Sequence, residues 1–174
     1  MPSVMPDVLD AGRLAALDAY DILDTAPEKG FDDVVLLARN ICDTPVALVS
    51  FVAGNRQWFK ARIGFADCET DLNSSVCAHV LAEPDLLVIP DLTKDTRTRG
   101  NPLVAGGPRI RFYAGAPLRT PEGEVLGSLC VIDGEPRPGG LSQAQAESLR
   151  ALAGQVMAQM ELRRALAGQR RALE

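Results

Sequence analysis

The sequence predicts an α+β fold in which helices from both ends of the chain cover one face of an antiparallel sheet. Two segments, 46–63 and 109–133, each contain two apolar runs around a short turn, which is typical of β-hairpins. Apolar residues recur at helical spacing before the first hairpin and again after the second. Strands placed between terminal helices therefore favour a layered domain.

The N-terminal part is expected to contain a tail and two helices. Residues 1–8 hold two prolines and no apolar period, which indicates a flexible tail. A helix over about 9–22 follows, and Thr25 and Glu28 then have the spacing of a capping box for a second helix. Pro45 ends that helix because proline lacks the backbone N–H and has a fixed φ.

The first hairpin is predicted to pair strands 46–52 and 57–63. Strict alternation places Trp58, Lys60 and Arg62 on one face of the second strand and its apolar residues on the other. A short helix from Ser74 or Ser75 to about Ala82 and a strand over 86–89 come next. Segment 91–108 reads as a long polar loop, and such loops are usually functional or mobile.

The second hairpin is predicted to pair strands 110–118 and 125–132. The second of these has apolar residues at both parities, so we expect a central strand that buries both faces and its Cys130. The last element is a long helix that reaches Leu173. Ser142 and Gln145 have the spacing of a capping box at its start.

Composition and charge exclude some classes of partner and site. The formal net charge is −5, so the chain has no footprint for nucleic acid or an anionic membrane. None of its four cysteines has C-x-x-C spacing, which argues against a metal site. The N-terminus does not resemble a signal peptide, and no apolar run reaches the length of a membrane span. We therefore expect a cytoplasmic protein with reduced thiols.

Five collinear blocks of the sequence resemble the GAF domains at the front of bacterial sensor histidine kinases and diguanylate cyclases. The blocks are RLAALDAYDILDTAPEKGFDDVVLLARNIC, VALVSFVAGNRQWFKARIGF, SSVCAHVL, NPLVAGGPRIRFYAGAPL and GEVLGSLCVID. They cover about residues 13–165. The resemblance implies a profilin-like sheet of five or six antiparallel strands, with terminal helices on one face and a ligand-pocket region on the other.

The resemblance also implies a domain plan and a function. We expect a flexible tail over 1–8, a GAF domain over 9–165 and an extension of the signalling helix over 166–174. The function implied is a non-catalytic sensory or regulatory domain in bacterial signal transduction, including two-component systems. Such a domain is expected to pass its output through the C-terminal helix to a downstream effector in a longer sensor protein. The sequence leaves the ligand and any cofactor unknown.

Several residues of the family's pocket region could line a small-molecule site that mixes aromatic faces with polar groups. The candidates are Trp58, Cys77, His79, Asp91, Arg111, Phe112 and Tyr113. Five of them have a competing structural interpretation: Trp58 and Phe112 as core residues, Cys77 as a small buried residue, His79 as a hydrogen-bonded pocket or helix residue, and Arg111 as a surface residue paired with an acid.

Two other functions compete with the sensory one. Phytochrome-like GAF domains attach a bilin to a cysteine followed directly by a histidine, whereas Ala78 separates Cys77 from His79 here. On a helix these two side chains would point in different directions, which argues against joint use as metal ligands too. Free-methionine-(R)-sulfoxide reductases use cysteines in this pocket region, which Cys68 and Cys77 resemble. The family's catalytic cysteine lies in the loop before the second hairpin, and segment 91–108 contains none.

The long C-terminal helix also suggests an assembly. Its apolar positions continue to Leu166 and Leu173, past the length needed to cover a sheet. A two-fold partner offers the simplest burial for these leucines, and Leu14 and Leu17 of the first helix could join the interface. We therefore expect a homodimer through the terminal helices.

Overall fold

The computed structural model describes residues 6–173 and has the predicted α+β architecture, with a six-stranded antiparallel sheet. The strands are β1 (Val46–Val52), β2 (Gln57–Ile63), β3 (Glu69–Thr70), β4 (Leu87–Ile89), β5 (Phe112–Arg119) and β6 (Val125–Asp133). The α-helices are α1 (Ala11–Tyr20), α2 (Lys29–Cys42), α3 (Pro102–Ala105) and α4 (Gln143–Leu173). Three 3-10 helices are η1 (Pro6–Leu9), η2 (Leu72–Ser74) and η3 (Cys77–Ala82).

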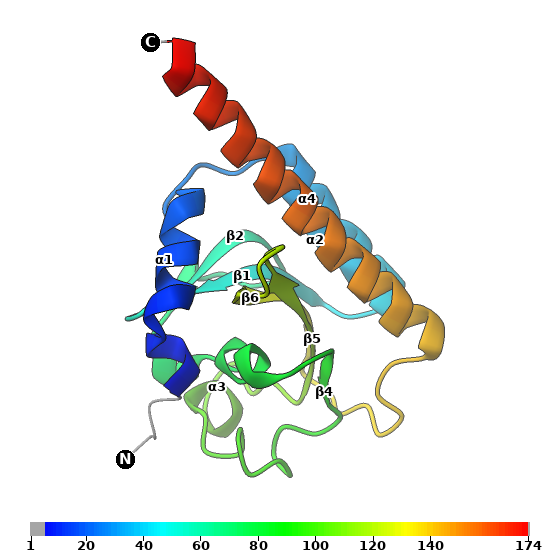
Figure 1. Cartoon of the computed structure of the whole chain (residues 1–174). Coiled ribbons are helices and arrows are strands. Elements are labelled where there is room, and N and C mark those ends of the chain that lie inside the picture. Colours follow the sequence, from blue (N-terminus) through cyan, green and yellow to red (C-terminus); the bar gives the residue numbers. More distant parts are fainter. Residues whose placement is uncertain (1–5, 174) are drawn as a thin grey trace.

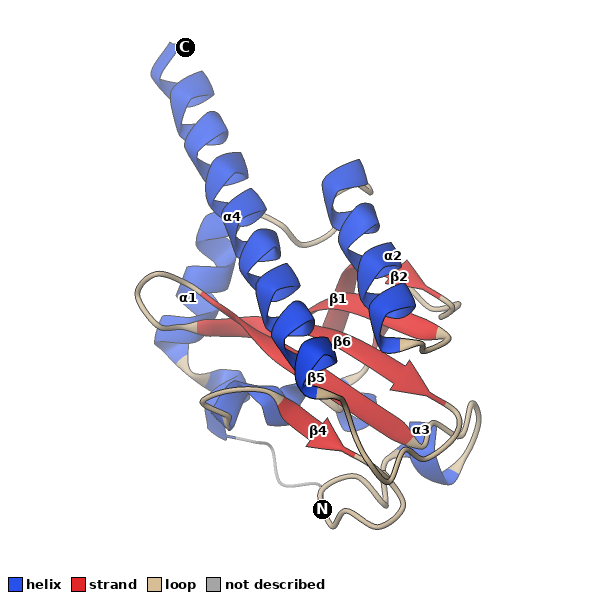
Figure 2. Cartoon of the chain, turned by 90° about the vertical axis from the view of Figure 1, so that its right-hand side faces the viewer, coloured by secondary structure: helices blue, strands red, loops and turns tan. Residues whose placement is uncertain are grey.

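The sheet separates two apolar layers. Helices α2 and α4 lie over one face, and the segments around α3 lie on the other side (Figure 1). Figure 2 shows the same two helices crossing the strands. Because side chains alternate along a strand, each strand contributes to both layers: in β6, Leu129 and Val131 pack with the helices, and Cys130 and Ile132 pack on the opposite side.

The prediction of a central, doubly buried strand is confirmed for β6. The strand order is β3-β2-β1-β6-β5-β4, so β6 lies between β1 and β5. Cys130 is 0% exposed, and each residue from Val125 to Ile132 is buried. The predicted hairpin of β5 and β6 is also present, with Ala116 opposite Leu129.

Strict alternation in β2 was wrong because the strand contains a bulge. Val49 of β1 lies opposite Ala61, but the next residue, Ser50, lies opposite Phe59, so Lys60 is the extra residue. The bulge brings Trp58 and Ala61 to the same helix-side core. It also aims the Lys60 side chain toward the segment before α2, where it is 0% exposed.

Part of the predicted tail of residues 1–8 belongs to a short helix. Residues 1–5 lie outside the described part, and residues 6–8 belong to η1. Val8 is buried at 2% exposure in the core opposite the helices. The buried Arg13 guanidinium holds this turn in place by donating to the carbonyl oxygens of Asp7 and Val8, at 3.0 and 2.8 Å.

The two predicted capping boxes have different outcomes. Ser142 and Gln145 form theirs: the backbone N–H of each donates to the side-chain oxygen of the other, at 2.9 and 3.1 Å. Thr25 and Glu28 do not, because α2 begins only at Lys29, and Glu28 has no side-chain capping bond. The Thr25 hydroxyl and the Glu28 carboxylate instead accept hydrogen bonds from Lys60.

The loop predicted over 91–108 contains the short helix α3, which Asn101 caps by accepting a hydrogen bond from the backbone N–H of Leu103. The aromatic and aliphatic residues around this loop close the face of the sheet opposite α2 and α4. Among the helices of residues 6–173, none combines the length and apolar character needed to cross a membrane.

Candidate functional site

A cluster of sulfur and hydroxyl groups is buried on the sheet face opposite α2 and α4. Cys77, the first residue of η3, accepts hydrogen bonds from the hydroxyls of Tyr113 and Ser128, both at 3.1 Å. The sulfur of Cys130 lies 3.8 Å from that of Cys77, and the two hydroxyl oxygens are 3.0 Å apart. We call Cys77, Tyr113, Ser128 and Cys130 the thiol cluster. All four residues are at most 1% exposed.

Neighbouring strands and one glycine bring this cluster together. Ser128 and Cys130 are two residues apart on β6, and Gly115 of β5 lies directly opposite Cys130. A Cβ atom at position 115 would lie 2.4 Å from the Tyr113 hydroxyl oxygen. The Tyr113 ring can therefore lie along its own strand, over residue 115, and reach Cys77 only because that residue is glycine.

The cluster changes the acidity of its thiols in opposite directions. Burial by itself raises the pKa of Cys77, but hydrogen bonds from Cys130, Ser128 and Tyr113 lower it to about 7. Burial, together with the neighbouring Cys77, raises the pKa of Cys130 well above its ordinary value. The same causes raise the pKa of Tyr113. Cys77 is therefore the thiol of the pair that ionises first.

A small cavity adjoins the thiol cluster. Its volume is about 10 Å³, and its lining includes Cys77, Tyr113, Gln57 and Phe65. This volume corresponds to about one water molecule, far below the range of about 300–1,000 Å³ typical of small-molecule sites. The expected pocket region is thus present on the expected face of the sheet but is filled by side chains.

The structure divides the seven predicted site residues among different places. Cys77 and Tyr113 meet in the thiol cluster, whereas Trp58 and Phe112 lie in the helix-side core. Phe112 and Tyr113 are neighbours on β5, so their side chains point to opposite faces of the sheet. Trp58 packs against Phe51 with ring centroids 6.5 Å apart. The structural interpretation therefore fits Phe112, whereas Trp58 also lines the groove between α2 and β2.

The three remaining predicted residues interact with residues of segment 91–108. His79 is half-buried, and burial and the nearby positive charge of Arg97 lower its pKa. The Asp91 carboxylate accepts hydrogen bonds from the backbone and the hydroxyl of Thr93, and these lower its pKa. Arg111 donates to the carbonyl oxygen of Val104 at 2.8 Å, which holds α3 against the start of β5.

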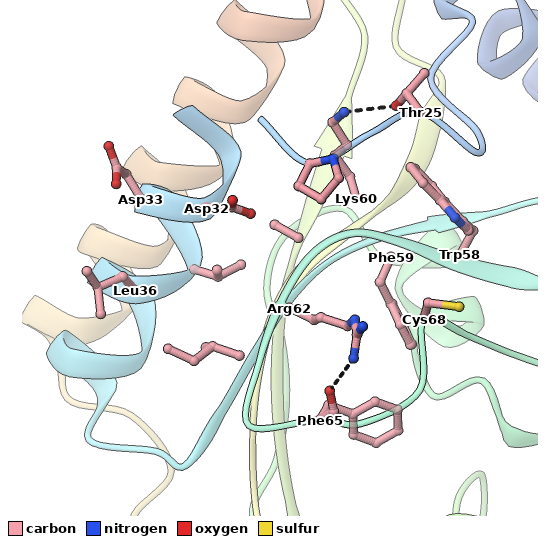
Figure 3. A pocket seen from close by; sticks show the side chains of 14 residues that line it. Thr25, Asp32, Asp33, Leu36, Trp58, Phe59, Lys60, Arg62, Phe65 and Cys68 are labelled. Atoms are coloured by element: carbon pink, nitrogen blue, oxygen red, sulfur yellow. Dashed lines mark hydrogen bonds between the residues drawn. The ribbon is translucent and has the colours of Figure 1, made fainter. Parts of the chain in front are cut away.

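A more open groove lies between α2 and β2 (Figure 3). Its volume is about 610 Å³, and Trp58, Arg62, Phe65 and the exposed Cys68 contribute to its lining. Lys60 lies at its end, where its three ammonium hydrogens are used by Thr25, the Ala26 carbonyl and Glu28 at 2.6–2.8 Å. Lys60 thus serves the structure around it and offers no free donor to a ligand.

Sequence reasoning missed Ser128 and Cys130 as members of the thiol cluster. Cys130 was expected only as a buried residue, since it lies in an apolar run and 53 residues from Cys77. The sequence of the second hairpin contains a pattern that could have identified Cys130 as a partner on this face of the sheet. A central strand that carries Ser128 and Cys130 at alternate positions presents both to one face.

A six-stranded antiparallel sheet with helices on one face and a small pocket region on the other defines a class of small α+β domains. The family profile of the GAF domain matches residues 26–160, and the chain belongs to this family. A cyclic di-GMP phosphodiesterase of Pseudomonas aeruginosa is 43% identical over 146 residues, which cover 84% of this chain and 25% of that protein. The chain thus spans about a quarter of the length of this curated relative.

Solved structures agree with this fold. The GAF domain of an Acinetobacter phosphoenolpyruvate-protein phosphotransferase superposes with a TM-score of 0.64 at 16% identity, covering 88% of this chain and 93% of that one. A domain of a putative two-component sensor histidine kinase from Sinorhizobium meliloti gives 0.62 at 15% identity, covering 84% and 99%. At such identities the likeness shows the fold alone, and function has to come from the site.

Proposed function

We propose that this chain is a non-catalytic regulatory GAF domain of a cytoplasmic bacterial signalling protein, and that its output passes through α4. The observation that supports this proposal is the length of α4, 31 residues or about 46 Å. Its buried residues end at Met160, and the helix then projects beyond the sheet (Figures 1 and 2).

The projecting end of α4 carries the apolar surface that a partner helix needs. Leu162, Leu166 and Leu173 are 59%, 50% and 89% exposed. At about 100° per residue these three leucines fall within roughly 40° of one another around the helix axis. One stripe of leucines on an isolated helix favours pairing with the same stripe of a second copy. We therefore propose a homodimer through this end of α4.

Polar contacts connect the base of this projection to the sheet. Glu28 accepts hydrogen bonds from Lys60 of the β2 bulge at 2.6 Å and from Arg163 of α4 at 2.9 Å. Gln159 of α4 donates to the carbonyl oxygen of Gly30 at 3.1 Å. A change in the position of β2 would thus reach α4 through charged, partly buried groups.

The proposed effector is one that turns over cyclic di-GMP. The support is the Pseudomonas aeruginosa relative, which is named as a cyclic di-GMP phosphodiesterase. The match covers 84% of this chain and a quarter of that protein. For a small-molecule input, the groove between α2 and β2 is a hollow of suitable size that has aromatic side chains in its lining.

The two competing functions have less support from the geometry. A bilin does not fit a cavity of about 10 Å³ beside a Cys77 that is 1% exposed. A sulfoxide reductase needs a substrate-accessible thiolate and a resolving thiol. Cys68 faces the groove, whereas Cys77 lines the separate cavity, so these two cysteines do not share one site.

Two assays test this proposal. The purified chain should turn over neither cyclic di-GMP nor free methionine sulfoxide supplied with thioredoxin, and turnover of either substrate would show that the domain is catalytic.

In the second assay, this chain replaces the matched segment of the Pseudomonas aeruginosa phosphodiesterase. We expect the chimera to hydrolyse cyclic di-GMP at a rate that Leu166→Glu changes. Gly168→Glu, which adds the same charge on the opposite side of α4, should leave the rate unchanged. Equal rates for both variants would exclude output through the leucine stripe.

A further inference from the structure

The two buried thiols of the thiol cluster have no part in the proposed output helix. Their sulfur atoms lie 3.8 Å apart, although 53 residues separate them in the chain. The two sulfur atoms of a disulfide are about 2.05 Å apart, so these two sulfurs have to move closer together by roughly 1.8 Å.

The surroundings of Cys77 suit a thiolate more than a thiol. Two hydroxyl groups, from Tyr113 and Ser128, point at its sulfur at 3.1 Å. A third buried hydroxyl, that of Ser50, lies beside the cluster, because Ser50 is opposite Ser128 in the β1–β6 pair. Hydroxyl donors around a sulfur stabilise its negative charge, and the thiolate is the reactive form of cysteine.

The cavity beside the cluster limits which molecule can reach it. Cys77 and Tyr113 line this cavity of about 10 Å³, which accommodates about one water molecule. Hydrogen peroxide is only slightly larger than water, whereas an organic hydroperoxide or a glutathione disulfide is many times larger.

We propose that Cys77 and Cys130 form a dithiol that hydrogen peroxide oxidises to an internal disulfide. This proposal concerns the chemistry of the thiol cluster and does not depend on the function proposed for α4.

The reaction proceeds in two balanced steps. First, the Cys77 sulfur attacks one oxygen of hydrogen peroxide, an S–O bond forms and the O–O bond breaks. The hydroxide that leaves takes up the proton released by Cys77, and one water and a sulfenic acid result. Second, the Cys130 sulfur attacks the Cys77 sulfur, the S–S bond forms and the S–O bond breaks. The hydroxyl leaves as water with the Cys130 proton, so two thiols are oxidised and one peroxide is reduced.

Peptide mapping of the whole chain tests this inference. Reduced protein is treated with hydrogen peroxide, unfolded with an alkylating agent and digested with trypsin and a glutamate-specific protease, which separates Cys68 from Cys77 at Glu69. We expect a cross-link between the Cys77 and Cys130 peptides and alkylated Cys42 and Cys68. No cross-link, or cross-links through Cys68 alone, would overturn the proposal.

Variants and oxidants of different size sharpen the test. Cys130→Ser should accumulate a sulfenic acid on Cys77, which dimedone traps when the oxidised protein is unfolded in its presence, and Cys77→Ser should give neither product. Tyr113→Phe removes one hydroxyl donor and should slow oxidation at neutral pH several-fold, because a smaller fraction of Cys77 is then thiolate. Cys68→Ser should leave the reaction unchanged.

The size of the oxidant tests entry through the cavity. If cumene hydroperoxide or oxidised glutathione cross-linked the wild-type chain as fast as hydrogen peroxide does, entry through the cavity would be contradicted. The wild-type result decides the matter even where a variant does not fold.

Discussion

At the scale of single residues, Gly115 is the position on which the geometry of the thiol cluster depends. Its missing side chain leaves the space that the Tyr113 ring occupies, and that ring carries a hydroxyl group to Cys77. One absent methyl group therefore decides whether a tyrosine side chain belongs to the thiol cluster. The same argument explains why a glycine persists inside a buried strand, where it otherwise weakens pairing.

Gly115→Ala should destabilise the fold by about 1–3 kcal/mol, because overpacking a buried strand forces side chains out of their preferred positions. Gly154→Ala is the matched control, since nothing lies within 4 Å of the Cβ position of this exposed glycine in α4. That change should stabilise the helix by up to about 1 kcal/mol. Urea unfolding of both variants measures the difference. A neutral Gly115→Ala would show that Tyr113 can lie elsewhere.

The acidity of Cys77 should make stability depend on pH. Despite burial, hydrogen bonds lower the folded-state pKa of Cys77 to about 7, below the ordinary value of 9.0. Between these two values the unfolded state holds a proton that the folded state has lost, so the free energy of unfolding rises with pH. This contribution is complete above about pH 9 and is lost as the pH falls through about 7.

Urea unfolding across this pH range, for wild type and Cys77→Ser, measures the effect. The wild type should gain stability relative to the variant as pH rises. Parallel pH profiles for the two proteins would show that Cys77 remains a thiol in the folded state.

At the scale of elements, the β2 bulge and the start of α2 depend on each other. The bulge turns Lys60 toward the helix side, and Glu28 accepts its hydrogen bond and that of Arg163. A buried ammonium group without a partner is costly, so three segments of the chain have to meet at this point.

Glu28→Gln should lower the free energy of unfolding by about 1–3 kcal/mol. Breaking a fully buried pair costs more, but the Glu28 side chain is 40% exposed, so solvent screens part of the effect. Asp33→Asn is the control, because it breaks the exposed pair with Lys29, and solvent screens such a pair so that its loss costs little. Chemical denaturation compares the two variants. Equal losses would mean that Lys60 and Arg163 find other acceptors.

At the scale of the whole molecule, the domain has one helix that is longer than the sheet it covers. The part of α4 up to Met160 packs in the core, and Arg163 still reaches Glu28. The proposed dimer differs from the sequence-based expectation in one respect. Leu17 of α1 is 2% exposed in the core, so it cannot contribute to an interface.

Sedimentation at micromolar concentration should show a dimer of the intact chain. Leu166→Glu, or a chain that ends at Met160, should be monomeric because the leucine stripe is charged or absent. Gly168→Glu should remain dimeric, since it places the same charge on the opposite side of α4. A monomeric wild type would refute this assembly, and so would dimerisation that neither change affects.

Local patterns determined the main elements of this protein. The apolar alternation of β5 and β6, the turn between them and the Ser142–Gln145 capping box are formed by residues close in sequence, so the sequence predicted them. The burial of both faces of β6 followed from its apolar residues at both parities. The family and its α+β fold could be predicted because five such segments occur in a fixed order.

Only the tertiary structure decided which side chains meet. Thr25 and Glu28 have the spacing of a cap, but Lys60, more than 30 residues away, takes both as acceptors because a buried ammonium group needs them. Cys77 and Cys130 are ordinary in their local sequence and become a pair only when η3 packs on β6. Periodicity specifies which face a side chain occupies, and the partner on that face depends on contacts between distant segments.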